Sequence, residues 1–268
     1  MVNRVLLAEF DRDPGRAVLK VSPEPAMFDE EFGALEHIHT HTAFPAPKPY
    51  FHVPYTPEQG YTLLALEYLP GIGLGQAPLS PHEREAIERQ LADALLALHQ
   101  HQAEGYGPAQ NARHPAWAAY FKERVRGRYE NIKGRISART AGQIERVLDR
   151  FDLIFADSGP PTLVHGDIWT TNILVTKQED GWRLAGLVDP KGLYADVEFE
   201  LSYIEIVHTL GDAFFSAYTA QSPLREGYSL RRAAYWLDVM IRHVDRFGDA
   251  YYHRATASLA AQLDYQKI

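Results

Sequence analysis

The sequence predicts an α+β fold with two lobes, a small β-rich lobe followed by a larger, mainly helical lobe. Strand-like segments rich in Val and Leu are concentrated in residues 2–69, together with one amphipathic helix. Helical patterns dominate residues 80–268. Between them, LPGIGLGQAP (69–78) is rich in Gly and Pro, which interrupt regular elements. We therefore expect an N-terminal lobe at 1–69, a linker at 70–79 and a C-terminal lobe at 80–268.

The composition is that of a soluble globular protein. The chain has 268 residues, of which 46% are hydrophobic, so it is long enough to bury a substantial core. Its net charge of −8 disfavours nucleic acid and anionic membranes as partners. The absence of cysteine excludes disulfides, thiolate zinc sites and a cysteine nucleophile. Without a signal peptide or an apolar run of about 18 residues, we expect a cytoplasmic protein with no obligate protein partner.

The N-terminal lobe is expected to open with a β-hairpin. VNRVLLAEF (2–10) and GRAVLKV (15–21) are β-prone, and DRDPG between them is rich in turn residues. Residues 27–41 fit an amphipathic helix. FPAPKPYFHV (44–53) then leads into an extended segment, and YTLLALEYL (61–69) has the composition of a buried strand.

The C-terminal lobe is expected to begin with a capped helix. Ser80 and Glu83 form a capping box, and Pro81 stands at the first helical position. We expect a helix over about 115–137 and another that starts near Thr140, where Gln143 completes a second capping box. Two short strands are expected at 173–175 and 182–188, and the chain after Asp196 is expected to be helical.

One short segment, LVHGDIWTTNILV (163–175), combines a polar loop with apolar anchors on both sides. Asp167 and Asn172 are spaced as in the catalytic loop of protein kinases, where the Asp is the base and the Asn holds a metal. Asp189 adds a carboxylate at the end of the strand-like GLV segment. Because Mg²⁺ prefers oxygen ligands, Asn172 and Asp189 are candidate metal ligands. Asp167 then remains free to accept a proton from a substrate hydroxyl.

A lysine in an apolar strand is the second candidate feature. Lys20 has apolar neighbours and needs an acidic partner, and Glu31 and Glu36 both lie on the following helix. In kinases a lysine on a strand binds the nucleotide phosphates, and a glutamate on the following helix forms an ion pair with it. Glu67 and Leu69 stand where the last strand of the small lobe enters the linker, and their free backbone groups suit an adenine ring. The order of these features points to phosphoryl transfer from ATP with Mg²⁺.

Three other motifs have simpler interpretations. GIGLG (71–75) lacks the third glycine of a nucleotide-binding run and is interpreted as linker. His37 and His41 are spaced like a metal-binding pair, but no third ligand is near, so we expect a solvated helix face. The basic segment FKERVRGRYENIKGR (121–135) has interleaved acids, and we expect an exposed helix face in preference to an anion site.

These motifs resemble those of the fructosamine kinase family, within the aminoglycoside phosphotransferase and protein-kinase-like superfamily, over nearly the whole chain. MFDEEFGALEHI resembles the family's Met-Phe-x-x-Glu helix, which makes Glu31 the partner of Lys20. HGDIWTTN matches HGD-x-W-x-x-N and includes Trp169. WAAYFKERV and DPKGLYADVEFELSY resemble two further family segments. The resemblance implies a protein-kinase-like fold and an ATP-dependent kinase that phosphorylates a sugar hydroxyl of ketosamines, which are amines carrying a fructose-like group.

Two departures from the family pattern leave alternatives open. The family has a strand and a glycine-containing phosphate loop before the segment like NRVLLAEF, whereas Met1 almost directly precedes it here. We therefore expect either a truncated or mis-started chain or a less well covered nucleotide, and a nucleotide-binding protein with little catalysis is one alternative. Lys191 after Asp189-Pro190 resembles some antibiotic kinases, which keeps an aminoglycoside-type acceptor as another.

Two side chains near the catalytic loop each have two interpretations. Trp169 either lines the acceptor pocket and stacks on a sugar face, or packs in the core under the loop. Glu200 either bonds the backbone of the catalytic loop, as an acid at this position does in related kinases, or is an ordinary acid at a helix N-terminus.

Overall fold

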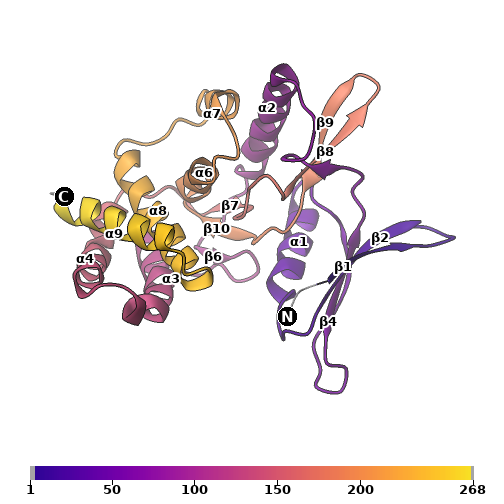
Figure 1. Cartoon of the computed structure of the whole chain (residues 1–268). Coiled ribbons are helices and arrows are strands. Elements are labelled where there is room, and N and C mark those ends of the chain that lie inside the picture. The colour runs from indigo at the N-terminus through magenta and orange to yellow at the C-terminus, as the bar shows by residue number, and fades with distance from the viewer. Residues whose placement is uncertain (1–3, 267–268) are drawn as a thin grey trace.

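The computed structural model describes residues 4–266 and has two lobes (Figure 1). The N-terminal lobe is an antiparallel sheet in the order β1-β2-β4-β3, with one helix packed against it. The C-terminal lobe is mainly helical, so the predicted α+β class is confirmed. The N-terminal elements are β1 (Arg4–Glu9), β2 (Arg16–Ser22), α1 (Asp29–His41), β3 (Pro49–Val53) and β4 (Thr62–Glu67).

The predicted hairpin forms, and it places β2 inside the sheet. β2 pairs with β1 on one side and with β4 on the other. Lys20 therefore stands opposite Val5 on β1 and Leu64 on β4. Backbone hydrogen bonds to both neighbouring strands fix the position of this lysine. A functional side chain is held most precisely when it stands on such a rigid element.

The helix expected at 27–41 begins at Asp29 and packs against the sheet. Phe28, just before its first turn, and Leu35 are buried against Leu64 and Leu66 of β4. This small apolar cluster is the core of the N-terminal lobe. It fixes the rotation of α1 about its axis and so decides which of its acidic side chains faces the sheet lysine.

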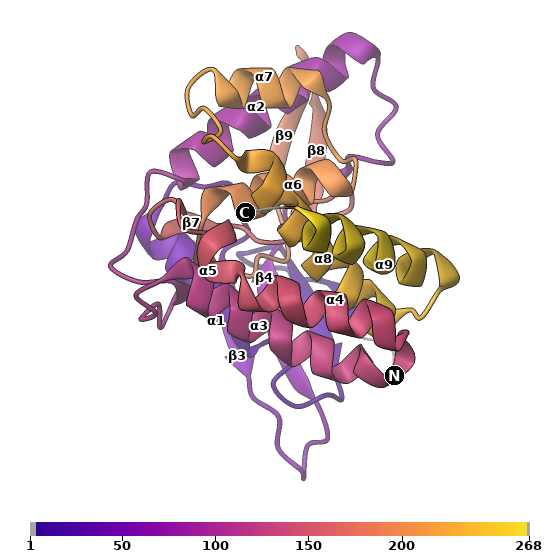
Figure 2. The ribbon, with the colours of Figure 1, turned by 90° about the vertical axis from the view of Figure 1, so that its left-hand side faces the viewer.

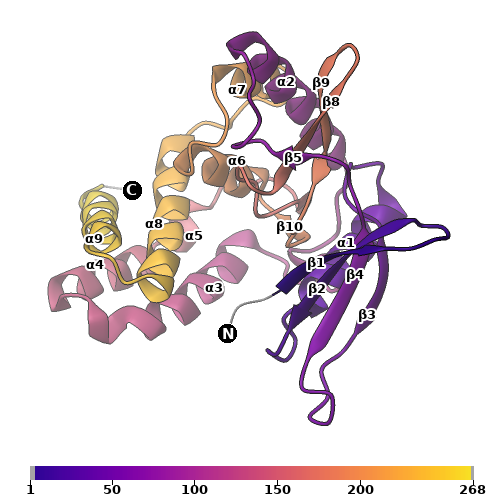
Figure 3. The ribbon, with the colours of Figure 1, turned by 45° about the vertical axis from the view of Figure 1, so that its right-hand side comes forward.

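The segment between the lobes is attached to the C-terminal lobe by strand pairing. β5 (Ile72–Gly73) lies within the expected linker and pairs antiparallel with β8 (Ile173–Gln178). Figure 3 shows β5 and β8 side by side. At Gly71 a Cβ atom would lie 2.9 Å from the carbonyl oxygen of Val175, so glycine is required for this close approach.

Among residues 4–266, no helix has the length and hydrophobicity of a membrane-spanning segment. The first helix of the C-terminal lobe begins as predicted. The Glu83 backbone N–H donates to the Ser80 hydroxyl, and the Glu83 carboxylate accepts from the Ser80 N–H at 2.8 Å. The helices are α2 (Pro81–Leu98), α3 (Trp117–Ile132), α4 (Ala138–Asp149), α5 (Phe151–Ile154), α6 (Val197–Ile206), α7 (Asp212–Thr219), α8 (Tyr228–Arg246) and α9 (Ala250–Tyr265).

The helix predicted to start near Thr140 forms, but its predicted capping box is wrong. The helix begins at Ala138, and Ser137 is its N-cap, with its hydroxyl accepting from the Thr140 N–H at 3.1 Å. Thr140 and Gln143, the expected capping pair, are buried inside the helix. The true cap lies three residues earlier because Ser137 already supplies the oxygen that the first turn requires.

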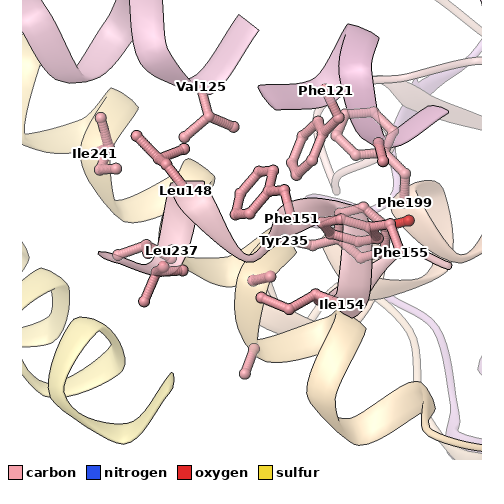
Figure 4. Close-up of a cluster of buried hydrophobic side chains, with 14 of the residues drawn as sticks. Phe121, Val125, Leu148, Phe151, Ile154, Phe155, Phe199, Tyr235, Leu237 and Ile241 are labelled. Atoms are coloured by element: carbon pink, nitrogen blue, oxygen red, sulfur yellow. The ribbon is translucent and has the colours of Figure 1, made fainter. Parts of the chain in front are cut away.

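An aromatic core joins the helices of the C-terminal lobe. Figure 2 shows α3 beside α4 and α8 beside α9, and α3 also contacts α8. Phe121 of α3 stacks on Phe151 with ring centroids 5.6 Å apart, and Phe155, Phe199 and Tyr235 pack around them (Figure 4). All five side chains are at least nine-tenths buried, so this cluster is a rigid base for the loops above it.

Two small sheets flank the His-Gly-Asp segment. The first has the order β6-β10-β7, which the sequence analysis did not anticipate, and the second has the order β5-β8-β9, in which β8 and β9 are the two predicted short strands. The segment runs from the end of β7 to the start of β8, so both of its ends are anchored in sheets. The remaining strands are β6 (Gly107–Pro108), β7 (Thr162–Val164), β9 (Gly181–Leu187) and β10 (Leu193–Ala195).

Candidate active site

Internal hydrogen bonds close the loop between β7 and β8. The Asn172 N–H donates to the carbonyl of Trp169, and the Asn172 side-chain amide donates to the carbonyl of Asp167, both at 2.9 Å. Ile168 and Ile173 are fully buried. The apolar residues of the segment therefore anchor the loop from below, and this explains the mixed composition of LVHGDIWTTNILV.

A buried acid on α6 supports the loop from behind. The Gly166 N–H donates to one carboxylate oxygen of Glu200 at 2.6 Å, and His99 lies 2.9 Å from the other. Burial alone would raise the pKa of Glu200, but the hydrogen bond and charge of His99, with His165 and Gly166, hold it below its usual value. Of the two interpretations of Glu200, the structure supports the bond to the loop backbone.

Asp167 points into the cleft and has a partner that the sequence analysis missed. The Tyr203 hydroxyl donates to a carboxylate oxygen of Asp167 at 3.0 Å. Burial and the Asp167 charge raise the pKa of Tyr203 to about 12, so the tyrosine stays a neutral donor near pH 7. Tyr203 lies three residues after Glu200 and therefore on the same face of α6. That spacing was the available signal for it in the sequence.

The structure brings together the predicted lysine, its helical partner and the second carboxylate. The Lys20 ammonium lies 2.6 Å from a Glu31 carboxylate oxygen and also forms an ion pair with Asp189. Burial alone would lower the pKa of Lys20, but these two carboxylates outweigh it and raise the pKa above its usual value. Within residues 4–266, Glu36 forms no ion pair with Lys20, so Glu31 is the partner that the motif predicted.

Two adjoining cavities in the cleft collect the predicted site residues. A cavity of about 680 Å³ is lined by Lys20, Glu31, Asp167, Trp169, Asn172 and Asp189. A neighbouring cavity of about 430 Å³ shares Lys20, Trp169, Asn172 and Asp189 and adds Val18, Leu66, Glu67 and Leu69. Trp169 is 41% exposed, which rules out core packing under the loop. The apolar side chains of the second cavity give it the character of a slot for a flat ring.

Asn172 and Asp189 line the same cavity, and side-chain oxygens of these types suit a hard divalent cation. Within residues 4–266 there is no cluster of three His, Asp or Glu side chains arranged to hold a metal ion. Mg²⁺ takes one or two protein ligands and completes its shell with water and phosphate oxygens, so this pair fits magnesium better than zinc. His37 and His41 pack against each other with ring centroids 4.5 Å apart and have no third ligand in the described part of the chain.

Comparisons with known proteins identify relatives of this chain. The sequence model of the fructosamine kinase family matches residues 15–265. A probable ketoamine kinase of Synechocystis is 28% identical over 247 residues, which cover 87% of this chain and 77% of that protein. The ketosamine-3-kinase of Mus musculus is 26% identical over 272 residues, covering 90% of this chain and 86% of the mouse protein.

Solved structures confirm the kinase-like fold. The crystal structure of a candidate fructosamine-3-kinase from Haemophilus somnus superposes with a TM-score of 0.75 at 18% identity, covering 97% of this chain and 87% of that one. A ternary complex of the aminoglycoside phosphotransferase APH(4)-Ia with ADP and hygromycin B superposes with a TM-score of 0.68 at 16% identity, covering 97% and 93%.

Proposed function

Since the chain belongs to the fructosamine kinase family and is therefore a phosphotransferase with an alcohol acceptor, we propose that it transfers the γ-phosphoryl group of Mg·ATP to a sugar hydroxyl of a ketosamine. The observation that carries this proposal is the meeting of Lys20, Asp167, Asn172 and Asp189 around one cavity between the lobes. These residues come from distant parts of the chain, and each has a distinct use in phosphoryl transfer.

In this proposal the residues divide the work by position. Asn172 and Asp189 would hold a magnesium ion, which would offset the negative charge of the phosphates. Lys20, held in place by Glu31, binds the nucleotide phosphates. The adenine ring lies in the apolar slot next to the backbone of Glu67 and Leu69.

On the acceptor side, Asp167 orients the sugar hydroxyl and accepts its proton as the bond to phosphorus forms. The hydrogen bond from Tyr203 keeps this carboxylate turned toward the cleft. Trp169 is exposed beside Asp167 and offers a flat apolar face to the sugar ring. The large rigid core beneath α6 supports this arrangement and limits how far the acceptor can shift.

An acceptor panel tests the proposal. The protein is incubated with Mg·ATP and, separately, with ketosamines, aminoglycosides and simple polyols, and the products are analysed by mass spectrometry. We expect one phosphoryl group on the ketosamines and an equal amount of ADP. Phosphorylation of aminoglycosides alone would contradict the proposed acceptor, and ATP binding without transfer to any acceptor would contradict the proposed catalysis.

A further inference from the structure

A third, smaller cavity adjoins the catalytic loop and is lined mainly by residues of α3, α6 and α8. Its volume is about 170 Å³, and it begins at Gly166, next to the proposed base. Phe199 and Tyr235, which belong to the aromatic core (Figure 4), form part of its wall. Its charged lining residues are Arg124, Arg128, Arg242, Lys191, Glu30 and Asp238.

One of the four cations has an ion-pair partner inside the protein. Arg128 forms a short ion pair with Asp238, whose side chain is only 3% exposed. Arg242 lies with its guanidinium carbon 5.4 Å from the ring centroid of Tyr203, the residue that bonds Asp167. The wall of this cavity is thus continuous with the catalytic carboxylate.

Arg124 has one buried donor without a partner among the residues that the structure describes. Its Nε atom is buried and has no hydrogen-bond partner among residues 4–266. Burial and the neighbouring Arg128 lower the pKa of Arg124, and Asp238 and Tyr120 offset only part of this effect. A buried donor on a charged group is costly when it stays unpaired, so such a group normally has an anionic partner.

The local charge is opposite to that of the whole chain. After Arg128 and Asp238 are paired, the lining keeps three cations and one acid, Glu30, which lies at the exposed rim. The protein as a whole has a net charge of −8. A concentration of unmatched positive charge in an acidic protein therefore belongs to a specific site, and it disfavours a polycationic aminoglycoside as the acceptor.

We propose that this cavity receives a carboxylate of the acceptor, so that the preferred substrates are ketosamines of amino acids with a free carboxylate close to the sugar-bearing nitrogen. The inference rests on the proposed function, because it places the sugar hydroxyl at Asp167 and the rest of the acceptor toward α3. A guanidinium has paired N–H donors whose spacing matches the two oxygens of a carboxylate. The Nε donor of Arg124 has no partner among residues 4–266. The volume of about 170 Å³ suits a short acidic terminus.

A matched pair of acceptors tests the inference in the intact protein. N-(1-deoxyfructosyl)glycine and N-(1-deoxyfructosyl)glycinamide carry the same sugar and have nearly the same size, but only the first has a carboxylate. We expect the kcat/KM of the acid to exceed that of the amide by about ten- to a hundredfold, as for a hydrogen-bonded charged group. The difference should lie mainly in KM.

Two arginine variants then locate the effect. In Arg124→Met the ratio of acid to amide should fall toward one, and Arg124→Lys should restore part of it. Arg126→Met is the matched control, because Arg126 lies on the same helix with 45% of its side chain exposed and does not line the cavity. It removes the same charge and should leave the ratio unchanged.

The outcomes separate this inference from the proposed function. Equal kcat/KM for acid and amide in the unaltered protein would overturn the carboxylate site while the ketosamine kinase stands. An equal loss of preference in Arg126→Met would also overturn it, because the effect would then come from the general field of the protein. Phosphorylation of neither compound would overturn the proposed function and this inference with it.

Discussion

At the scale of single residues, we expect different defects when Asp167 and Asp189, the two carboxylates of the cleft, are replaced by Asn. Asp167→Asn removes the proton acceptor and should lower the single-turnover rate by about 10²- to 10⁴-fold. Mg·ATP affinity should survive, since Lys20, Asn172 and Asp189 are intact. Asp189→Asn removes charge from the proposed metal site and should weaken Mg·ATP binding as well as turnover.

Rates and affinities measured for both variants decide these assignments. Turnover of a confirmed acceptor by Asp167→Asn at the unaltered rate would show that Asp167 is not the base. Full Mg·ATP affinity in Asp189→Asn would remove Asp189 from the metal site even in an active kinase.

Tyr203 is expected to act as a positioning residue for Asp167. Tyr203→Phe removes the hydroxyl that donates at 3.0 Å and leaves the ring in place. Without this bond the carboxylate has more freedom to turn away, and kcat should fall on the order of tenfold. Tyr228→Phe is a matched control, because that hydroxyl bonds Glu205 and lines neither of the two cavities that contact Asp167 or Gly166. A similar loss of kcat in both variants would point to a general packing effect.

The buried acid behind the loop predicts a pH dependence of stability. The pKa of Glu200 is lowered in the folded protein, because the hydrogen bond and charge of His99 outweigh the effect of burial. The stabilisation by this group is therefore fully present above the ordinary pKa of a glutamate and is lost as pH falls through the folded value. Glu200→Gln should lower the free energy of unfolding by about 1–3 kcal/mol at pH 7, and by less near pH 3.

Urea unfolding of the two proteins at pH 7 and near pH 3 measures this difference. A difference that is the same at both pH values would mean that the charge of Glu200 does not contribute, and that only the shape of the side chain matters.

The residues of the site that the sequence predicted are those tied to a linear motif. His-Gly-Asp-x₄-Asn fixes Asp167 and Asn172 by spacing, and an apolar strand makes Lys20 conspicuous. Their chemical roles stay predictions until the variants are measured. Arg124 and Arg128 were interpreted as part of an exposed helix face, but they line a cavity. Their orientation depends on how α3 packs against α6 and α8, and a single helix does not encode which distant elements will meet it.

At the scale of elements, the N-terminus of α6 is expected to control both stability and activity. The Asp196 carboxylate accepts from the Glu198 N–H at 2.9 Å, and both of its oxygens accept from the same Nη2 atom of Arg225 at 2.7 Å. Asp196→Ala removes the cap and one of the two carboxylates that pair with Arg225, the other being Glu198 at 3.0 Å, and should cost about 2–4 kcal/mol. Ser80→Ala, which removes the cap of the distant α2, should cost only about 1 kcal/mol.

Activity distinguishes these two caps further. α6 carries Glu200 and Tyr203, so Asp196→Ala should lower turnover even at a temperature where the variant is fully folded, whereas Ser80→Ala should not. Circular dichroism melts and single-turnover rates on both variants provide the check, and equal activity in the two would disconnect the start of α6 from the catalytic loop.

Elements with a local code were predictable, and those held by distant partners were not. The first hairpin has turn residues between two β-prone segments, and α2 has a complete capping box with a proline at its first position. β6, β7 and β10 have only two or three residues each, too few to show a period. They exist because strands from three parts of the chain pair around the catalytic loop, and such pairing is decided by the tertiary fold. The N-cap of α4 is a milder case, since Ser137 and Thr140 are both residue types that favour an N-cap position.

At the scale of the whole molecule, the proposed nucleotide site is made by both lobes. Lys20 and Glu31 come from the N-terminal lobe, and Asn172 and Asp189 from the C-terminal lobe, and all four line one cavity. A ligand that contacts both sides stabilises the entire folded chain, because it binds only where the lobes are assembled. Nucleotide binding should therefore be visible as a shift of the main unfolding transition.

Mg·ATP at a hundred times its dissociation constant is expected to add about 2.7 kcal/mol to the free energy of unfolding. For a chain of 268 residues this corresponds to a rise of roughly 5–10 °C in Tm.

ATP with EDTA should give a smaller rise, since Asn172 and Asp189 then have no metal to hold and the phosphates face the Asp189 carboxylate directly. Lys20→Met should reduce the shift with Mg·ATP, because Lys20 is the only cation among residues 4–266 that lines both cleft cavities. Differential scanning calorimetry with each addition separates these cases. No shift with millimolar Mg·ATP in a folded sample would contradict ATP as the phosphoryl donor, and equal shifts with and without EDTA would contradict the metal site while leaving nucleotide binding in place.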